Sequence, residues 1–247
     1  MTLPVRFRIV GPGRAGESLG RALARAGWAR HGDLRRGDDP AGACRGVDLV
    51  VLATPDAAIA EVAAAVEPDP TTVVAHLAGS LGLDVLATHP RPAALHPLVS
   101  LPSPDLGATR LAAGAWFAVA GDPLVQRAAD DLGGRWFEVA DVDRATYHAA
   151  AAVASNHLVA LLGQVERLAS GIGVPPEAYL DLARASLDNV AALGPAAALT
   201  GPVARGDWAT VARHLDALPA DERPAYLALA EAAARLAGRT LPAVLLP

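Results

Sequence analysis

Two histidines, His76 and His96, stand where an imidazole could exchange a proton with a bound molecule. His76 lies near the end of an apolar run, and His96 opens a His-Pro-Leu motif. An imidazole titrates near neutral pH, which suits it to acid–base work. The sequence contains no lysine, so a lysine acid and Schiff-base chemistry are excluded. We therefore expect His96, and after it His76, to be catalytic, with His148 and His157 as the other histidines in reach of a site.

Further polar residues could bind the reacting molecule. Ser155 and Asn156 lie inside an alanine-rich segment, where polar side chains indicate either a site or a helix–helix hydrogen bond. We predict that Asn156 holds a substrate oxygen and that Ser155 assists it. Arg205 lies in a polar loop and could bind a carboxylate through a bidentate pair. Ser80 is expected to contact the substrate as well.

Three glycines, Gly11, Gly13 and Gly16, have the spacing of a phosphate-binding turn. The turn lies between a strand predicted over 5–10 and a helix predicted over 17–26. In that context the first glycine permits a tight turn, the second admits a pyrophosphate, and the third lets the helix pack closely. The amides at the helix start then favour negative charge. The residues expected to contact a dinucleotide here are Gly11, Pro12, Gly13, Arg14, Ala15 and Gly16.

The choice between the two nicotinamide coenzymes depends on the loop about 20 residues further on, where an acid binds ribose hydroxyls or an arginine binds a 2′-phosphate. That loop contains Asp33, Arg35 and Arg36. Two adjacent arginines could hold a phosphate bidentately, which favours NADP, and NAD stays open. A solvated charged loop is the alternative.

The carboxyl ends of the next two predicted strands complete the expected cofactor site. Ligands of open α/β sheets bind at this edge. For Asp56, capping of the following helix is the alternative. The residues expected on the nicotinamide side are Ala53, Thr54, Pro55, Asp56 and Gly79.

The spacing of hydrophobic residues along the sequence changes near residue 141. Strands are predicted over 5–10, 47–53, 71–77, 115–120 and 135–139, and helices over 17–26, 57–66 and 123–132. Alternation of this kind indicates a parallel sheet covered by helices. Beyond it only helices are predicted, over 144–171, 176–193, 208–218 and 224–237. We expect an α/β fold: a Rossmann-like dinucleotide-binding domain over 1–141 and an all-α substrate and dimerisation domain over 142–247.

Composition excludes several classes of function. Hydrophobic residues make up 52% and charged residues 19%, which is typical of a globular protein. The net charge of −5 without a basic block argues against nucleic-acid binding. One cysteine, Cys44, forms no internal disulfide, and no metal-ligand spacing is found. We expect a cytoplasmic protein without a metal, a membrane span or a signal peptide.

The chain resembles a known family at several motifs. These are the glycine turn, Ala-Thr-Pro-Asp at 53–56, His-Leu-Ala-Gly-Ser at 76–80, His-Pro-Leu at 96–98, Ala-Ser-Asn at 154–156 and Thr-Gly-Pro-Val-Ala-Arg-Gly-Asp at 200–207. They resemble a Rossmann-like domain joined to a DUF2520 domain, a branch of the 6-phosphogluconate dehydrogenase-like and pyrroline-carboxylate reductase-like oxidoreductases. The resemblance implies hydride transfer with NADP or NAD, and a homodimer formed through the C-terminal helices.

One position departs from that pattern. The hydroxyacid dehydrogenases of this superfamily carry a catalytic lysine one helical turn before the asparagine that Asn156 matches, whereas Ala152 stands there in this chain. The lysine mechanism therefore does not carry over. We expect an NADP-preferring reductase of a small carboxylate-bearing carbonyl or imine, such as the 2-oxo acid ketopantoate. A prephenate-type dehydrogenase and a non-catalytic NADP-binding sensor are the alternatives.

Overall fold

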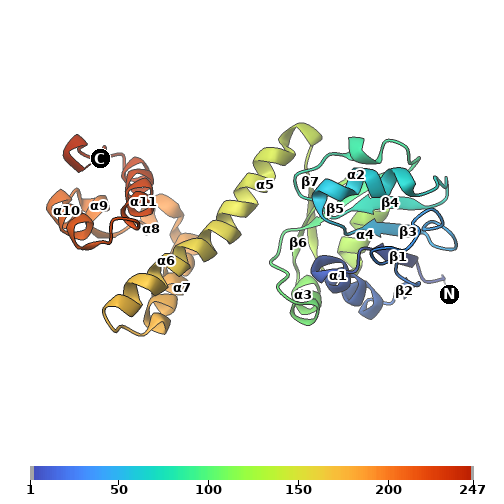
Figure 1. Cartoon of the computed structure of the whole chain (residues 1–247), viewed down its shortest axis with the longest axis horizontal. Coiled ribbons are helices and arrows are strands. Elements are labelled where there is room, and N and C mark those ends of the chain that lie inside the picture. Colours follow the sequence, from blue (N-terminus) through green and yellow to red (C-terminus); the bar gives the residue numbers. More distant parts are fainter. Residues whose placement is uncertain (1–2, 246–247) are drawn as a thin grey trace. The chain divides into compact units, whose positions relative to one another are not determined.

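The N-terminal part of the protein is built on one mixed sheet. The computed structural model describes residues 3–245. The described chain divides into two compact units, and the division falls between Asn156 and His157. In the first unit seven strands form the sheet in the order β2-β1-β3-β4-β5-β6-β7 (Figure 1). They are β1 (Arg6–Val10), β2 (Ala29–Arg30), β3 (Leu49–Leu52), β4 (Val73–His76), β5 (Pro92–Pro97), β6 (Trp116–Gly121) and β7 (Arg135–Glu138).

Helices cover both faces of this sheet. They are α1 (Arg14–Arg25), α2 (Asp56–Ala65), α3 (Pro104–Leu111) and α4 (Leu124–Asp131). The unit also contains the 3₁₀ turns η1 (Leu83–Leu86) and η2 (Asp141–Asp143) and the helix α5 (Arg144–Ala152), which follows η2. Alternate strand residues point to opposite faces, so β3 contributes to two cores. Leu49 and Val51 pack in the core beneath α1, α3 and α4, whereas Val50 and Leu52 pack in the core beneath α2 and η1.

The carboxyl ends of the parallel strands lie at one edge of the sheet. Strands β1 to β5 run parallel, so their carboxyl ends meet at the same edge. The order reverses at β1, because β2 follows it in sequence on one side and β3 on the other. Such a switch point is where open α/β sheets bind ligands.

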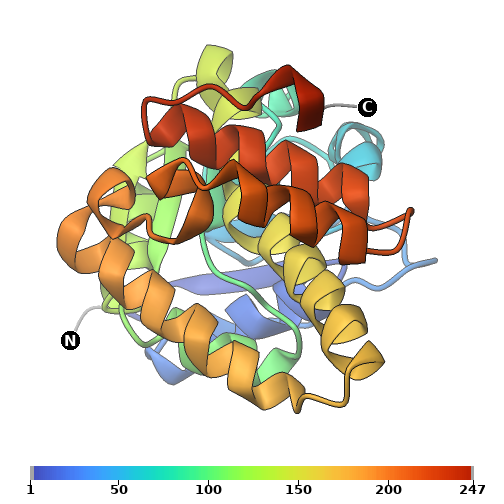
Figure 2. The ribbon, with the colours of Figure 1, turned by 90° about the vertical axis from the view of Figure 1, so that its left-hand side faces the viewer.

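The C-terminal unit is helical. Its helices are α6 (Leu158–Gly171), α7 (Pro176–Leu193), α8 (Pro195–Ala198), α9 (Gly201–Arg205), α10 (Trp208–Ala217) and α11 (Arg223–Leu236), followed by the 3₁₀ turn η4 (Ala243–Leu245). Helices α10 and α11 lie side by side, and Val211 packs against Ala230 and Ala234 (Figure 2). The Gln164 side-chain amide donates to the Glu222 carbonyl at 3.0 Å, which ties α6 to the turn before α11. No helix within residues 3–245 has the length and apolar character needed to cross a membrane.

The predicted Rossmann-like sheet followed by helices is confirmed, with corrections in detail. Strand β5 and helix α3 were not expected, because prolines at the ends of β5 hide its pattern. Strand β6 pairs antiparallel with β5, so the sheet is not wholly parallel. The single helix expected over 144–171 is interrupted by a π-helical turn, η3 (Val153–His157). The last strand ends at Glu138, and the domain boundary at residue 141 stays a prediction.

Candidate functional site

A cleft of about 860 Å³ opens at the switch point of the sheet. Its walls come from the carboxyl ends of β1 and β3 and from the loop that follows β2. Eight of the residues predicted to contact a cofactor line it, namely Gly11, Pro12, Gly13, Arg35, Arg36, Ala53, Thr54 and Pro55. Arg14, Ala15 and Gly16 form the first turn of α1 instead.

The glycine turn has the geometry that a close-lying phosphate requires. Gly11 has a φ of +84°, which disfavours any other residue. A Cβ at Gly16 would lie 2.8 Å from the Cβ of Ala53 and from the Ile9 side chain, so α1 rests directly on the strand edge. A Cβ at Gly13 would meet only the Gly11 carbonyl, at 4.0 Å. No side chain caps α1, which leaves its first amides available to a ligand.

Asp33, Arg35 and Arg36, the charged residues of the loop after β2 on which the coenzyme prediction depends, have different partners. The Asp33 carboxylate accepts a hydrogen bond from Arg30 Nε at 3.1 Å, and Arg30 also pairs with Glu17. Asp33 is therefore held by a neighbouring cation. Arg35 and Arg36 line the cleft, and neither guanidinium forms an ion pair within residues 3–245. Arg35 and Arg36 thus line the cleft and Asp33 does not, while Asp38 and Glu61 are the acidic residues in its lining.

The carboxyl end of β3 supplies a polar atom without a partner. Thr54 Oγ1 is buried and makes no hydrogen bond with the described chain, although a buried hydroxyl is normally satisfied. Asp56 is the first residue of α2, and Pro55 takes the N-cap position, so capping by Asp56 is wrong. The Asp56 carboxylate instead accepts a hydrogen bond from Ser80 Oγ at 3.2 Å. This bond links the ends of β3 and β4 along the site edge.

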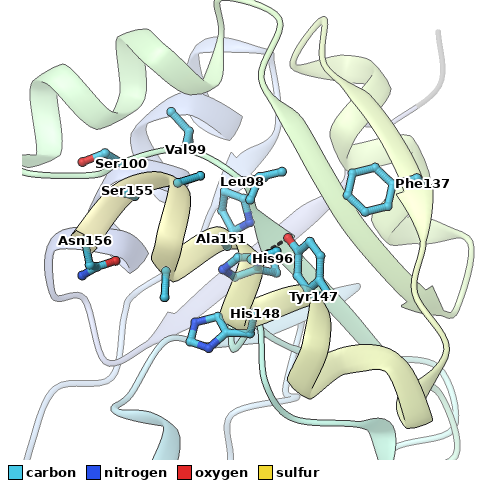
Figure 3. A pocket seen from close by; sticks show the side chains of 14 residues that line it. His96, Leu98, Val99, Ser100, Phe137, Tyr147, His148, Ala151, Ser155 and Asn156 are labelled. Atoms are coloured by element: carbon cyan, nitrogen blue, oxygen red, sulfur yellow. Dashed lines mark hydrogen bonds between the residues drawn. The ribbon is translucent and has the colours of Figure 1, made fainter. Parts of the chain in front are cut away.

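A second cleft, of about 780 Å³, lies at the carboxyl end of β5 (Figure 3). His96 projects from β5, and Tyr147 and His148 project from α5. Ser155 and Asn156 line the same cleft from the π-helical turn η3. Insertions of this kind in helices are frequent at functional sites. The structure thus brings together three of the four residues predicted to be catalytic, His96, Ser155 and Asn156.

His96 and Tyr147 form a hydrogen-bonded pair inside this cleft. His96 Nδ1 lies 2.6 Å from the Tyr147 hydroxyl oxygen, and the two rings meet edge to face. Burial, followed by the nearby His148 and Arg144, lowers the pKa of His96 to about 4. Burial raises the pKa of Tyr147 to about 12, although Arg144 opposes that shift. Both groups are therefore uncharged at neutral pH.

Gly79 makes room for the histidines. A Cβ at Gly79 would lie 2.7 Å from His148 Cδ2 and 2.8 Å from His96 Nε2. Any side chain there would displace both rings. Gly79 was predicted to bind cofactor, and it lies between the ends of β3 and β5, against the second cleft. A binding role for its backbone stays a prediction.

His76 does not line either cleft, which differs from its predicted role. Its side chain is fully buried, and its Nε2 lies 3.1 Å from the Gly82 carbonyl. Its Nδ1 has no partner in the described chain. Burial lowers the pKa of His76 and keeps the ring neutral. His76 is the last residue of β4 and lies inside the protein, and its catalytic role stays a prediction.

Arg144 is the charged residue that the sequence did not single out. Its side chain is 1% exposed, and none of its guanidinium nitrogens makes a hydrogen bond with the described chain. The Asp141 carboxylate lies 3.4 Å from Arg144 Nε. This single ion pair leaves an enclosed cation without hydrogen bonds, which is costly unless another group compensates it. Its position at the start of a predicted helix resembled ordinary helix composition, so no signal in the sequence separated it from other arginines.

Arg205 belongs to the C-terminal unit. It ends α9, and Gly206 follows it in a left-handed conformation with a φ of +74°. Its role in binding a carboxylate stays a prediction. Asp207 accepts a hydrogen bond from the Thr210 amide at 3.1 Å and caps α10. Within residues 3–245 no group of three acidic, histidine or cysteine side chains is placed to hold a metal ion.

Residues 117–233 match the family model described as "Domain of unknown function (DUF2520)". The match covers 117 of the 247 residues. The predicted resemblance to this family is thereby confirmed. The DUF2520 domain begins in β6 and ends in α11, so it supplies Tyr147, His148, Ser155 and Asn156 to the second cleft, whereas His96 precedes it.

Several solved structures share the fold. A candidate NADP oxidoreductase from Bacteroides fragilis is 21% identical, with a TM-score of 0.78 over 96% of this chain and 99% of that chain. A protein from Thermotoga maritima is 23% identical, with a TM-score of 0.71 over 94% and 98% of the two chains. Pyrroline carboxylate reductase from Plasmodium falciparum, solved with NADP bound, is 13% identical, with a TM-score of 0.62 over 94% and 98%. No curated protein sequence matches the chain.

Proposed function

We propose that this protein is an NAD(P)-dependent oxidoreductase that prefers NADP and reduces a small carboxylate-bearing carbonyl or imine. The observation that carries the proposal is the open glycine turn at the switch point, faced by two unpaired arginines. A dinucleotide pyrophosphate would lie over Gly11 to Gly13, and its adenosine 2′-phosphate beside Arg35 and Arg36. The fold is also that of a reductase solved with NADP bound.

The residues of the first cleft fit such a coenzyme. Gly13 leaves open space where a phosphate approaches, and the buried Thr54 Oγ1 lacks a hydrogen-bond partner that a ligand could supply. Asp33 is engaged by Arg30 and is not free to bind ribose hydroxyls, which favours NADP over NAD. When bound, the coenzyme supplies a hydride to the substrate carbon.

The second cleft supplies the groups that act on the substrate. His96 lies at the end of β5, and Asn156 can hold the substrate oxygen while Ser155 assists it. Leu98, Val99 and Phe137 give the same space an apolar wall. A 2-oxo acid such as ketopantoate is the substrate we test first, with Arg205 or Ser80 as carboxylate ligand.

We also propose that the protein forms a homodimer through its C-terminal helices. Within Pro176–Leu193 no residue of α7 is buried. Leu182, Leu187 and Leu193 are each more than half exposed, and so is Val159 of α6. Exposed apolar side chains gathered on neighbouring helices mark an interaction surface, and a second copy of the chain offers the matching apolar face.

Calorimetry with NADPH, NADH and ATP tests the cofactor, and NADPH oxidation with a panel of small 2-oxo and cyclic imino acids tests the reaction. We expect NADPH to bind more tightly than NADH, ATP to give no heat, and turnover with at least one acid. Turnover of prephenate alone with NADP would favour a prephenate-type dehydrogenase. Tight NADPH binding with no turnover would favour a sensor. An absence of heat with both nicotinamide coenzymes would contradict the proposal.

A further inference from the structure

The second cleft contains a phenol placed to exchange protons. Tyr147 lines the cleft from α5, and its hydroxyl points at the His96 ring (Figure 3). The hydrogen bond between them is 2.6 Å long and crosses from β5 to α5. Phe137 packs edge to face against the other side of the Tyr147 ring and holds its orientation. The hydroxyl is thus fixed at the cleft by contacts on two sides.

Burial is the main influence on the protonation of this pair, and it disfavours the charged form of both rings. His148 and Arg144, from α5, and His76, from β4, disfavour a positive charge on His96, and only Asp56 opposes them. Tyr147 faces Arg144 along its own helix and His96 across the cleft. The pair is therefore a neutral phenol beside a neutral imidazole.

In a neutral pair, either Tyr147 or His96 can be the donor of the hydrogen bond between them. When Tyr147 donates to His96 Nδ1, the phenolic proton is occupied. When Nδ1–H donates to the phenolic oxygen, the Tyr147 proton is free to point into the cleft. The second arrangement gives a proton donor that is neutral, fully protonated at physiological pH and supported from behind by an N–H group.

The enclosed Arg144 guanidinium supports the charge that such a donor would develop. It has no hydrogen-bond partner in the described chain, and its nearest carboxylate, that of Asp141, is 3.4 Å away and half exposed. A cation one helical turn from Tyr147 stabilises a phenolate relative to the phenol. The pair with Asp141 leaves all three Arg144 guanidinium nitrogens without a hydrogen bond, which is consistent with a role in the reaction.

We propose that the Tyr147 hydroxyl donates the proton to the substrate oxygen or nitrogen, with His96 as the positioning residue that restores it. This inference rests on the proposed reductase function. As hydride adds to the substrate carbon, the C=O or C=N π pair moves to the heteroatom, which takes the Tyr147 proton. The O–H bond breaks and leaves a phenolate. His96 Nδ1–H then reprotonates the phenolate, while a solvent water protonates Nε2 and leaves as hydroxide, so atoms and charges balance. Proton exchange with solvent returns His96 to its Nδ1–H form before the next turnover.

Replacing the hydroxyl tests the proposal directly. Tyr147→Phe keeps the ring and removes only the proton donor. We expect kcat with the best acid of the panel to fall by about 100-fold or more, since general acids contribute on the order of 10²–10⁴-fold. The Kd of NADPH should stay within about threefold, because the hydroxyl belongs to the second cleft and not to the first.

The chain offers a matched control for this variant. Tyr226 hydrogen-bonds His214 Nδ1 at 2.8 Å, with the same edge-to-face ring geometry, in the C-terminal unit. Tyr226→Phe should leave kcat within about twofold, because that pair lines neither cleft. Equal losses in the two variants would point to a general structural effect and overturn the assignment.

The acidity of the phenol separates a proton donor from a structural tyrosine. Incorporation of 3,5-difluorotyrosine at position 147 makes the phenol more acidic without changing its shape. The wild-type phenol, with its pKa of about 12, should give no alkaline limb in the working range of pH. We expect the difluorotyrosine protein to show an alkaline limb in its kcat profile at the pKa of its phenol, measured by fluorine NMR. A difluorotyrosine protein without an alkaline limb at that pKa would overturn the proposal. In parallel, a preformed N-methyl iminium acid needs no proton, so Tyr147→Phe should reduce it at the wild-type rate.

If no acid on the panel is reduced, the pKa of the fluorinated phenol in the two coenzyme complexes tests the role of Tyr147. A proton donor must lie beside the nicotinamide, whose oxidised ring is cationic. NADP⁺ should therefore lower the pKa of the fluorinated phenol relative to its NADPH complex, whereas identical titrations would overturn the proposal. A wild-type protein that binds neither coenzyme would instead refute the reductase function, so the two failures are distinguishable.

Discussion

Gly16 lies so close to Ala53 that a Cβ on Gly16 would approach the Ala53 Cβ to 2.8 Å. The first turn of α1 therefore rests on the end of β3, where the first cleft opens. We predict that Gly16→Val lowers the free energy of unfolding by about 1–3 kcal/mol, the usual cost of overpacking, and weakens NADPH binding by displacing the glycine turn. Urea denaturation and calorimetry measure the two effects. Gly32→Ala is the matched control, since a Cβ at Gly32 meets nothing within 4 Å, and an equal loss there would contradict the explanation.

Arg35 and Arg36 should decide coenzyme preference. Hydrogen bonds to a charged partner contribute about 1.5–3 kcal/mol, so replacing both arginines by glutamine should raise the Kd of NADPH by roughly 10- to 100-fold. Binding of NADH should change little, because it lacks the 2′-phosphate. Calorimetric titration with both coenzymes measures the difference. Arg45→Gln, at an exposed residue paired with Glu67 outside the cleft, is the control. Parallel losses for NADPH and NADH would contradict a 2′-phosphate site.

The free energy of unfolding should fall in acid, because His96 takes up a proton when the chain unfolds. Its pKa is about 4 in the folded protein and about 6.5 in an unfolded chain. Between these two pH values the imidazole is protonated in the unfolded chain and neutral in the folded protein. The contribution of His96 to the free energy of unfolding is therefore fully present above pH 6.5 and is lost as the pH falls towards 4. Buried His76 has a lowered pKa and contributes in the same direction. His96→Gln should flatten the decline in thermal stability across that window by at most about 3 kcal/mol. A variant with an unchanged slope would show that His96 is not enclosed as described.

Asp207 should stabilise the C-terminal unit as a helix cap. Its carboxylate accepts hydrogen bonds from the amide and the hydroxyl of Thr210. Asp207→Ala should cost about 1 kcal/mol of unfolding free energy, whereas Asp207→Ser, which retains an acceptor, should cost only a fraction of that. Chemical denaturation followed by circular dichroism compares the two variants. If serine and alanine proved equally destabilising, the loss would not come from the cap.

The proposed dimer can be tested on the exposed leucines of α7. Leu182 is 62% exposed and Leu187 is 54% exposed. Introducing a charge with Leu182→Glu should shift the protein from dimer to monomer in sedimentation velocity, because burying an unpaired carboxylate is costly. Glu177→Gln, a polar substitution in the first turn of the same helix, should leave the association unchanged. A wild-type protein that sediments as a monomer at all concentrations would exclude this interface.

The order and type of most elements in the N-terminal unit followed from the sequence, because hydrophobic period and turn residues are local properties. Glycine spacing between a strand and a helix located the first cleft, since only that backbone can make the turn. Adjacent arginines marked its rim. What stayed out of reach was the direction of β6 and the existence of β5, because strand pairing is decided between distant segments and prolines masked the β5 pattern.

The second cleft was decided by tertiary structure. Tyr147 lies within the single helix predicted over 144–171, and its spacing alone does not show whether its hydroxyl faces a site. Only the packing of α5 against β5 brings that hydroxyl to His96. Arg144 looked like an ordinary helical arginine until folding enclosed it. The sequence by itself determined a Rossmann-like chain with a phosphate-binding turn and without lysine. The fold alone decided which ionisable groups meet, because that depends on contacts between residues as far apart as His96 and Tyr147.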